Sequence, residues 1–169
     1  GASSGVELVG VTRGPVFEVK NISQALFFKK WLDEHLSLLQ TEARKTSTHL
    51  KLLKLGTRIA GNYVYVRFYF NTDEAMGMNM ATIATDKIVS FIENKTKVPC
   101  LAISGNFCVD KKPAWLNFIS GRGRRVWAEV IITKDLVKTI LKTSPQKLFD
   151  VWLAKCMMGS IMSGALGFN

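Results

Sequence analysis

The chain has 169 residues, the length of one ordinary domain or of two small ones, with 47% hydrophobic and 21% charged residues. Its 13 glycines and 4 prolines follow no period, so disordered, collagen-like and low-complexity classes are excluded. The uncharged run over 156–169 is too short to cross a bilayer, and no secretory signal begins the chain. The net charge of +10 favours an anionic partner, which leaves nucleic acid, membrane surfaces and phosphorylated cofactors open.

Cysteine and histidine are sparse. Cys100, Cys108 and Cys156 form an odd set without a CxxC pair, so the sequence predicts neither a disulfide framework nor a zinc site, and favours a reducing compartment. His35 and His49 are too few for a metal centre or a triad, and we interpret them as structural.

The first half of the chain predicts strands and helices in alternation. Alternating residues predict a strand over 16–20, and Asn21 or Ser23 caps a helix that runs to about residue 44. A strand follows over 50–59, with Gly56 as its expected bulge or kink.

The segment YVYVRFYF over 63–70 predicts the strongest strand. One face carries Val64, Val66, Phe68 and Phe70, and the other carries Tyr63, Tyr65, Arg67 and Tyr69. A helix is expected over 75–94, directing inward Met80, Ile83, Ala84, Ile88 and Phe91. A last strand is expected over 98–103. The order strand, helix, strand, strand, helix, strand predicts an α+β fold of the ferredoxin-like βαββαβ kind.

The character changes after Ile103. A polar loop leads to SGRGRR (120–125), a turn with an arginine cluster, and then to a strand over 126–132. Thr133 is expected to cap a helix to about Leu141, and Ser144 a helix to about Lys155. The apolar residues 156–169 predict a helix that packs on a partner outside this chain.

Three stretches carry chemistry. The segment 73–80 is expected to open a helix and form an anion site, unless it is only a cap followed by a Met-rich core turn. The loop 104–113 gathers Ser104, Asn106, Asp110 and two lysines, which can act as fixed cations toward a carboxylate or an oxyanion, or form a solvated turn. Arg13 can hold a carboxylate, although a surface arginine is the plainer interpretation.

An RNA-binding module is the main alternative. The basic charge, the βαββαβ order and the tyrosines on one strand face all suit it, but the RNP1 arrangement is absent from the third strand. A small-ligand-sensing domain of the same fold would leave the two lysines of the loop without a purpose.

Six segments in order resemble the catalytic portion of the 3-hydroxy-3-methylglutaryl-CoA (HMG-CoA) reductase family, of the class I eukaryotic type. They are GASSGVELVGVTRGPV, RIAGNYVYVRF, EAMGMNM, AISGNFCVDKKPA, ISGRGR and KCMMGSIMSGALGFN. The resemblance implies a small NADP-binding ferredoxin-like domain over 15–103, inserted between the segments 1–14 and 104–169 of a larger α/β substrate-binding domain. It also implies an NADPH-dependent oxidoreductase that makes mevalonate and CoA by two hydride transfers, a step of isoprenoid and sterol precursor synthesis.

The resemblance also implies roles for individual residues. Lys111 matches the catalytic lysine. The substrate-binding positions match Arg13, Ser104, Asp110, Lys112 and Lys155. The cofactor-binding positions match Ser47, Thr48, His49, Glu74, Met76, Gly77, Met78 and Asn79.

The chain departs from the family pattern at Glu74, where the motif has Asp, and at Thr48, where Arg is frequent. The family's catalytic Glu, Asp and His have no counterpart within 1–169, so we expect a fragment that is inactive alone. The resemblance further implies no metal and no nucleic acid partner, a homodimer or homotetramer for the whole enzyme, and a place on the cytosolic face of the endoplasmic reticulum.

Overall fold

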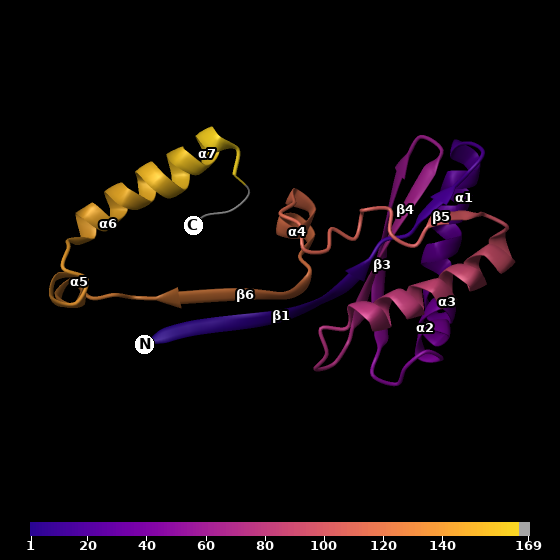
Figure 1. Cartoon of the computed structure of the whole chain (residues 1–169), viewed down its shortest axis with the longest axis horizontal. Coiled ribbons are helices and arrows are strands. Elements are labelled where there is room, and N and C mark those ends of the chain that lie inside the picture. Colours follow the sequence, from indigo (N-terminus) through magenta and orange to yellow (C-terminus); the bar gives the residue numbers. More distant parts are fainter. Residues whose placement is uncertain (166–169) are drawn as a thin grey trace.

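The computed structural model describes residues 1–165, and Figure 1 shows a folded body with a long arm to one side. The strands are β1 (Ala2–Arg13), β2 (Val16–Glu18), β3 (Lys51–Ala60), β4 (Tyr63–Asn71), β5 (Cys100–Ala102) and β6 (Gly123–Val130). The helices are α1 (Ile22–Glu34), α2 (Leu36–Arg44), α3 (Met78–Thr96), α4 (Trp115–Ser120), α5 (Lys134–Thr139), α6 (Pro145–Val151), the π-helical η1 (Trp152–Gly159) and α7 (Ser160–Ser163).

Strand β4 is the centre of the sheet. Strand β3 pairs along one edge of it, while β2 and the end of β1 pair in succession along the other. Strand β5 lies beyond β2, and every pairing is antiparallel. The chain passes from β1 to β2 at Pro15, which has no N–H to donate but whose carbonyl accepts from Val66 N at 3.0 Å. The α+β class is confirmed.

The apolar face of β4 forms the middle of the core, as predicted. Val64, Val66, Phe68 and Phe70 are fully buried, and residues of α1, α2 and α3 pack in the same cluster. Burying side chains of this size stabilises the fold by about 1.5–3 kcal/mol each. The prediction for Ile83 is wrong, because its side chain is 61% exposed. The buried residues of α3 include Ala84 and Ile88, as predicted, and also Ala81 and Ile92.

The predicted helix over 21–44 is broken in two at His35. Asn21 caps α1 through its side chain, as expected. The ring of His35 stacks on Trp31 at 4.4 Å, and its Nδ1 lies 2.8 Å from the Trp31 carbonyl oxygen. These contacts accompany the end of α1 at Glu34, and α2 begins at Leu36.

Two further predictions need correction. Gly56 pairs regularly with Arg67, and the bulge in β3 lies between Leu52 and Lys54. Helix α3 begins at Met78 rather than near residue 75. The cause is a turn in which Ala75 N donates to Thr72 O, followed by Gly77 at φ +73°.

The outer face of the sheet is also covered. The ring of Phe107 lies 5.8 Å from that of Tyr65, while Arg67 is 1% and Tyr69 7% exposed. Residues 104–122 therefore occupy the face on which an RNA-binding module would stack bases, which removes the structural basis of that alternative.

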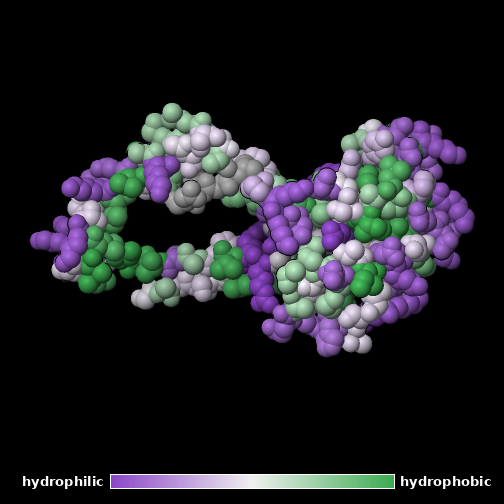
Figure 2. Space-filling view, viewed as in Figure 1, coloured by the Kyte–Doolittle hydropathy of each residue, from purple (hydrophilic) through white to green (hydrophobic). Residues whose placement is uncertain are grey.

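The arm consists of β1 and β6, paired from Ala2↔Val130 to Gly10↔Gly123, and of the helices that follow (Figure 1). Thr133 and Ser144 cap α5 and α6 as predicted. Many large apolar side chains are exposed there, among them Ile131, Phe149 and Met162, and Figure 2 shows an opening between the helices and the strand ladder. The end of the predicted last helix, residues 166–169, lies outside the described residues. None of the described helices has the length and apolarity that a membrane crossing requires.

Candidate active site

The lysine loop, residues 104–113, has a strained backbone. Asn106, Val109 and Lys111 have φ angles of 62°, 51° and 53°. A positive φ is rare for non-glycine residues and costly for a β-branched one such as Val109. Such conformations persist only where the surroundings hold them, which marks this loop as a candidate functional segment.

Asn117 of α4 holds the lysine loop through side-chain hydrogen bonds. Its Nδ2 donates to the carbonyl oxygens of Val109 at 2.9 Å and of Lys112 at 3.1 Å. Its Oδ1 accepts from Nη2 of the buried Arg67 at 2.9 Å. The bonds of Asn117 therefore connect the backbone on both sides of Lys111 to the central strand.

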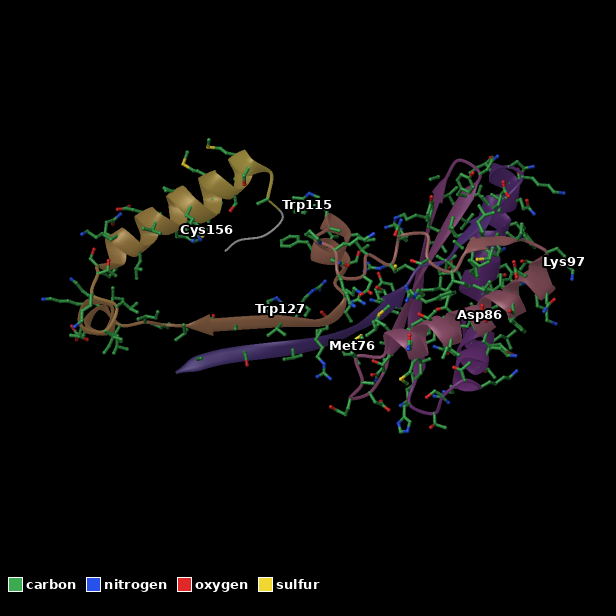
Figure 3. The ribbon with its side chains drawn as sticks, in the orientation of Figure 1. Met76, Asp86, Lys97, Trp115, Trp127 and Cys156 are labelled. Atoms are coloured by element: carbon green, nitrogen blue, oxygen red, sulfur yellow. The ribbon has the colours of Figure 1, made fainter. Side chains whose placement is uncertain are left out.

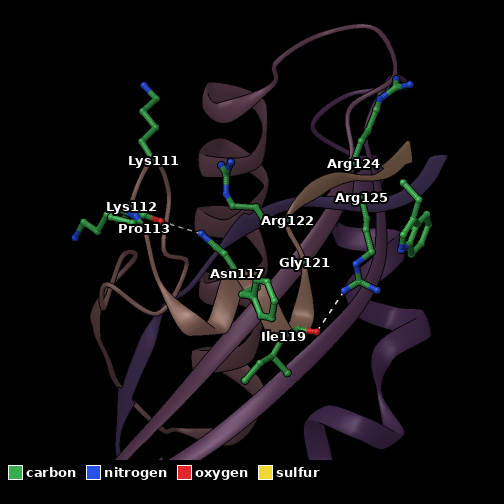
Figure 4. A pocket seen from close by; sticks show the side chains of 11 residues that line it. Lys111, Lys112, Pro113, Asn117, Ile119, Gly121, Arg122, Arg124 and Arg125 are labelled. Atoms are coloured by element: carbon green, nitrogen blue, oxygen red, sulfur yellow. Dashed lines mark hydrogen bonds between the residues drawn. The ribbon is translucent and has the colours of Figure 1, made fainter. Parts of the chain in front are cut away.

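Lys111 and Lys112 line a cavity of about 950 Å³ between the loop, α4 and the start of β6 (Figure 4). We call it the cationic cavity, because Arg122, Arg124 and Arg125 also line it, together with Pro113, Asn117, Phe118, Ile119, Gly121 and Trp127. These lining residues include no carboxylate and no histidine, so the cavity is suited to a negatively charged ligand.

Arg13 and Ser104 both act on Cys108 of the loop. Nη2 of Arg13 donates to Oγ1 of Thr82 on α3 at 2.6 Å, and Oγ of Ser104 lies 3.3 Å from Sγ of Cys108. Burial alone would raise the pKa of Cys108, but Ser104, the backbone around Asp110 and the charge of Arg13 together lower it below its ordinary value. The Nε of Arg13 is buried without a hydrogen-bond partner.

Asp110 pairs with an arginine of the cationic cavity. Its Oδ1 lies 2.5 Å from Nη2 of Arg122, in a contact that is an ion pair by distance but lacks hydrogen-bond alignment. Nε of Arg122 donates to Oγ1 of Thr12 at 3.1 Å, and its Nη2 lies 3.0 Å from Sδ of Met78.

The two stretches assigned to the cofactor lie side by side. Lys51 pairs with Asn71, so the residues just beyond this end of the β3–β4 pair meet, and Nδ1 of His49 lies 3.3 Å from Oδ2 of Asp73. Ser47 Oγ accepts from the His49 backbone N–H at 3.1 Å. Thr48 is exposed.

The N-terminal end of α3 borders a second cavity, of about 330 Å³, which we call the helix-end cavity. Glu74 and Met76 line it, and so do Arg122 and Arg124 of the cationic cavity. Figure 3 shows Met76 at the end of α3 beside the base of the arm. Asn79 is exposed in the first turn of α3. The lining also includes Asp73, and the two arginines supply the positive charge that the phosphates of a nucleotide require.

Lys155 is not brought to the residues of the two cavities, because it lies exposed in η1 on the arm.

The sequence analysis missed the contacts of Arg67, Asn117 and Arg122. The glycines on both sides of Arg122 in SGRGRR were the available signal, whereas Arg67 and Asn117 carried none beyond an ordinary strand and helix pattern.

Comparison with known proteins gives one family. A family model described as hydroxymethylglutaryl-coenzyme A reductase matches residues 1–169. The chain belongs to this family.

Similar proteins named 3-hydroxy-3-methylglutaryl-coenzyme A reductase occur in archaea and in an insect. The Methanothermobacter thermautotrophicus protein is 41% identical over all of this chain and 43% of its own length. The Pyrococcus horikoshii protein is 44% identical over 94% of this chain and 39% of its own length. The Blattella germanica protein is 38% identical over 100% of this chain and 20% of its own length.

The chain thus spans about two fifths of the archaeal reductases it matches. A solved structure of the class II reductase of Streptococcus pneumoniae, described as bound to NADPH, resembles 60% of this chain and 29% of that chain, with a TM-score of 0.51 and 16% identity. This likeness is one of fold.

Proposed function

We propose that this chain carries the cofactor-binding and lysine-bearing part of an enzyme that reduces HMG-CoA to mevalonate and CoA with NADPH. The observation that carries the proposal is the shared lining of the two cavities: Arg122 and Arg124 border both the cavity of Lys111 and the cavity at the end of α3. A hydride donor and an acceptor carbonyl need such adjacent sites.

Lys111 is the group that we assign to the carbonyl. As hydride reaches the thioester carbon, the carbonyl oxygen gains an electron pair, and a fixed ammonium stabilises that charge. The carbon–sulfur bond then breaks, CoA leaves as its thiolate, and mevaldehyde accepts the second hydride at the same carbon. The thiolate and the new alkoxide each take up a proton from groups of the whole enzyme outside this chain. The strained backbone of Lys111, held on both sides by Asn117, supports a fixed position for its ammonium.

The substrate carboxylate is assigned to the cations around the loop. Lys112 and Arg13 supply charge, while Ser104 and Asp110 order the loop through Cys108 and Arg122. Lys155 joins this set only as the family resemblance implies, and its place on the arm gives it no contact with the loop among the described residues.

The cofactor is assigned to the helix-end cavity. NADPH, when bound, supplies the hydride. Met76 and Glu74 line the wall, and the pair of His49 with Asp73 holds Ser47–His49 against this edge. Gly77, Met78 and Asn79 are assigned to the cofactor by the family resemblance, since they begin α3 directly after this wall. Thr48 is the residue we expect to alter the choice between NADPH and NADH.

We infer a ferredoxin-like insertion for residues 15–103. The strand order β5, β2, β4, β3 with antiparallel neighbours supports it, and so do the three helices that share one core with the sheet. Residues 1–14 and 104–169 form the flanking unit, in keeping with the pairing of β1 with β6.

The whole enzyme is proposed to be a homodimer or homotetramer of class I type. The predicted location at the endoplasmic reticulum rests on the eukaryotic-type resemblance alone, because the relatives reported above include archaeal proteins. Fractionation of the native source would test it: recovery outside that membrane would contradict the location.

The proposal is tested by grafting. This chain replaces the matching segment of the Methanothermobacter thermautotrophicus reductase, and oxidation of NADPH is followed with HMG-CoA. We expect turnover in the graft, at least about a hundredfold less with Lys111→Met, and no loss with Lys97→Met, a lysine at the far end of α3 (Figure 3). A folded graft without turnover, or one in which Lys111→Met has no effect, would contradict the proposal.

The chain alone is expected to lack turnover. The described residues that line the cationic cavity include no carboxylate or histidine to deliver a proton to the product oxygen. Oxidation of NADPH by the isolated chain with HMG-CoA would show this part of the account to be wrong.

A further inference from the structure

Arg122 joins three separate segments of the site. Its Nη2 pairs with Asp110 at 2.5 Å and contacts Sδ of Met78 at 3.0 Å, while its Nε donates to Thr12 at 3.1 Å. The side chains of Arg122 and Asp110 are 20% and 21% exposed, so solvent screens their attraction only in part. One guanidinium therefore touches the lysine loop, β1 and the first residue of α3.

The backbone around Arg122 is built to direct this side chain. Gly121 and Gly123 have φ angles of +70° and +69°, which glycine adopts without strain. A Cβ at Gly121 would lie 2.9 Å from Cγ2 of Val9. In the same turn Arg124 is exposed, and Arg125 pairs with Glu7 at 3.2 Å. The turn thus directs the side chain of Arg122 inward, which it does not do for Arg124 or Arg125.

Thr12 extends the connection to the loop backbone. Thr12 is fully buried. Its Oγ1 donates to the carbonyl oxygen of Cys108 at 2.7 Å and accepts from Nε of Arg122. Arg122 is therefore linked to the loop at Cys108 as well as at Asp110, directly before Lys111. Lys112 is held differently, since its Nζ donates to Oδ1 of Asn106 inside the loop.

We propose that Arg122 is a positioning residue that couples occupancy of the helix-end cavity to the placement of Lys111. The inference rests on the proposed function, because the coupling requires that NADPH bind in the helix-end cavity, which Arg122 lines. A ligand that contacts Arg122 there changes the pose of the guanidinium, and the pair with Asp110 carries that change to the next residue, Lys111.

The test measures the acetylation rates of Lys111 and Lys112 in this chain by mass spectrometry, with and without NADPH, alongside NADPH affinity by calorimetry. The variants are Arg122→Met, Arg122→Lys and, as a control, Arg58→Met, whose guanidinium donates only to the adjacent Thr57 carbonyl oxygen among its described hydrogen bonds. Thermal unfolding of each variant is recorded beside the labelling.

In the unchanged chain and in Arg58→Met, NADPH is expected to change the Lys111 rate by about fivefold and the Lys112 rate much less. Arg122→Met should weaken NADPH binding, because Arg122 lines the helix-end cavity, and it should abolish the Lys111 response even at NADPH concentrations that calorimetry shows to saturate the variant. Arg122→Lys should restore part of the response. If the role of Arg122 is purely structural, Arg122→Met will change the acetylation rates of Lys111 and Lys112 equally, even without NADPH. The unfolding temperature will then change as well.

Two results overturn the inference. If Arg122→Met keeps the Lys111 response, or changes Lys111 and Lys112 alike, Arg122 does not couple the sites although NADPH binds. If the folded, unchanged chain binds no NADPH, the cofactor assignment fails and the inference fails with it.

Discussion

Nη2 of Arg67 donates to Oδ1 of Asn117 across 2.9 Å, and this bond ties the centre of the sheet to the helix that follows the lysine loop. Arg67 also donates to the hydroxyl of Tyr69 and to the carbonyl oxygen of Gly121. Burial lowers the pKa of Arg67 from its ordinary value, and the Tyr69 hydroxyl opposes this shift. A guanidinium that is 1% exposed needs all of these acceptors, so it fixes α4 and, through Asn117, the backbone around Lys111.

Two substitutions at Asn117 should separate its two tasks. Asn117→Ala removes one of the three acceptors of Arg67 and the donor of two loop carbonyls, so it should lower the free energy of unfolding by about 1–3 kcal/mol. Asn117→Asp keeps an acceptor for Arg67 but loses both donors to the loop. We expect it to retain most of the stability while the lysine loop exchanges its amide hydrogens faster. Equal losses of stability in both variants would contradict this division.

Gly77, the glycine of the segment 73–80, should tolerate alanine less well than Gly61 does. A Cβ there would lie 2.4 Å from Cβ of Thr72, whereas Gly61, at φ +56°, has nothing within 4 Å. Gly61→Ala should cost only the left-handed conformation, about 1–2 kcal/mol. Gly77→Ala should add about 1–3 kcal/mol of overpacking and displace the start of α3. Chemical denaturation measures both, and similar losses would show that Thr72 moves aside freely.

The thiol of Cys100 should make stability fall at high pH. Burial raises its pKa from 9.0 to about 11. Between these values the unfolded chain loses a proton that the folded chain keeps, so the free energy of unfolding declines as pH rises from 9 to 11. Cys100→Ser should flatten that part of the profile in thermal melts recorded at several pH values. An unchanged profile would show that Cys100 ionises as freely in the folded chain.

Cys108 should act in the opposite direction. Its pKa is lowered in the fold, because Ser104, the Asp110 backbone and Arg13 outweigh the effect of burial. The folded chain ionises first as pH rises toward 9, so unfolding then takes up a proton and stability increases. Cys108→Ser should remove this increase, whereas Cys100→Ser should not. A profile that keeps its rise in Cys108→Ser would assign the effect to another group.

The alternation of β4 predicted the core well, because burial on one side imposes a strict period of two. The same alternation placed Arg67 on the other face but did not predict its burial. The residues that accept from it, Asn117 and Gly121, lie 50 and 54 positions later in the chain and leave no mark on the strand pattern. Helix ends were predicted less well: the break at His35 depends on ring stacking with Trp31, and the late start of α3 on a positive φ at Gly77.

The loop 104–113 and the segment 73–80 were found from their residue types, because clustered polar groups at element ends indicate a site. Their joining through Arg122 could not be predicted, since it needs β1, α3 and β6 to meet in three dimensions. The glycines on both sides of Arg122 were visible, but only the structure shows which arginine of the cluster they direct inward.

The account depends most directly on whether NADPH binds at the end of α3. Calorimetry of NADPH with this chain, beside NADH, should be compared for the unchanged chain, Asn79→Ala in the first turn of α3, and Asn94→Ala near its other end. We predict saturable binding that prefers NADPH, weakened about tenfold or more by Asn79→Ala, the loss of one good hydrogen bond to a charged ligand, and unaffected by Asn94→Ala. A folded chain that binds no NADPH, or that loses as much affinity in Asn94→Ala as in Asn79→Ala, would contradict the assignment of this site.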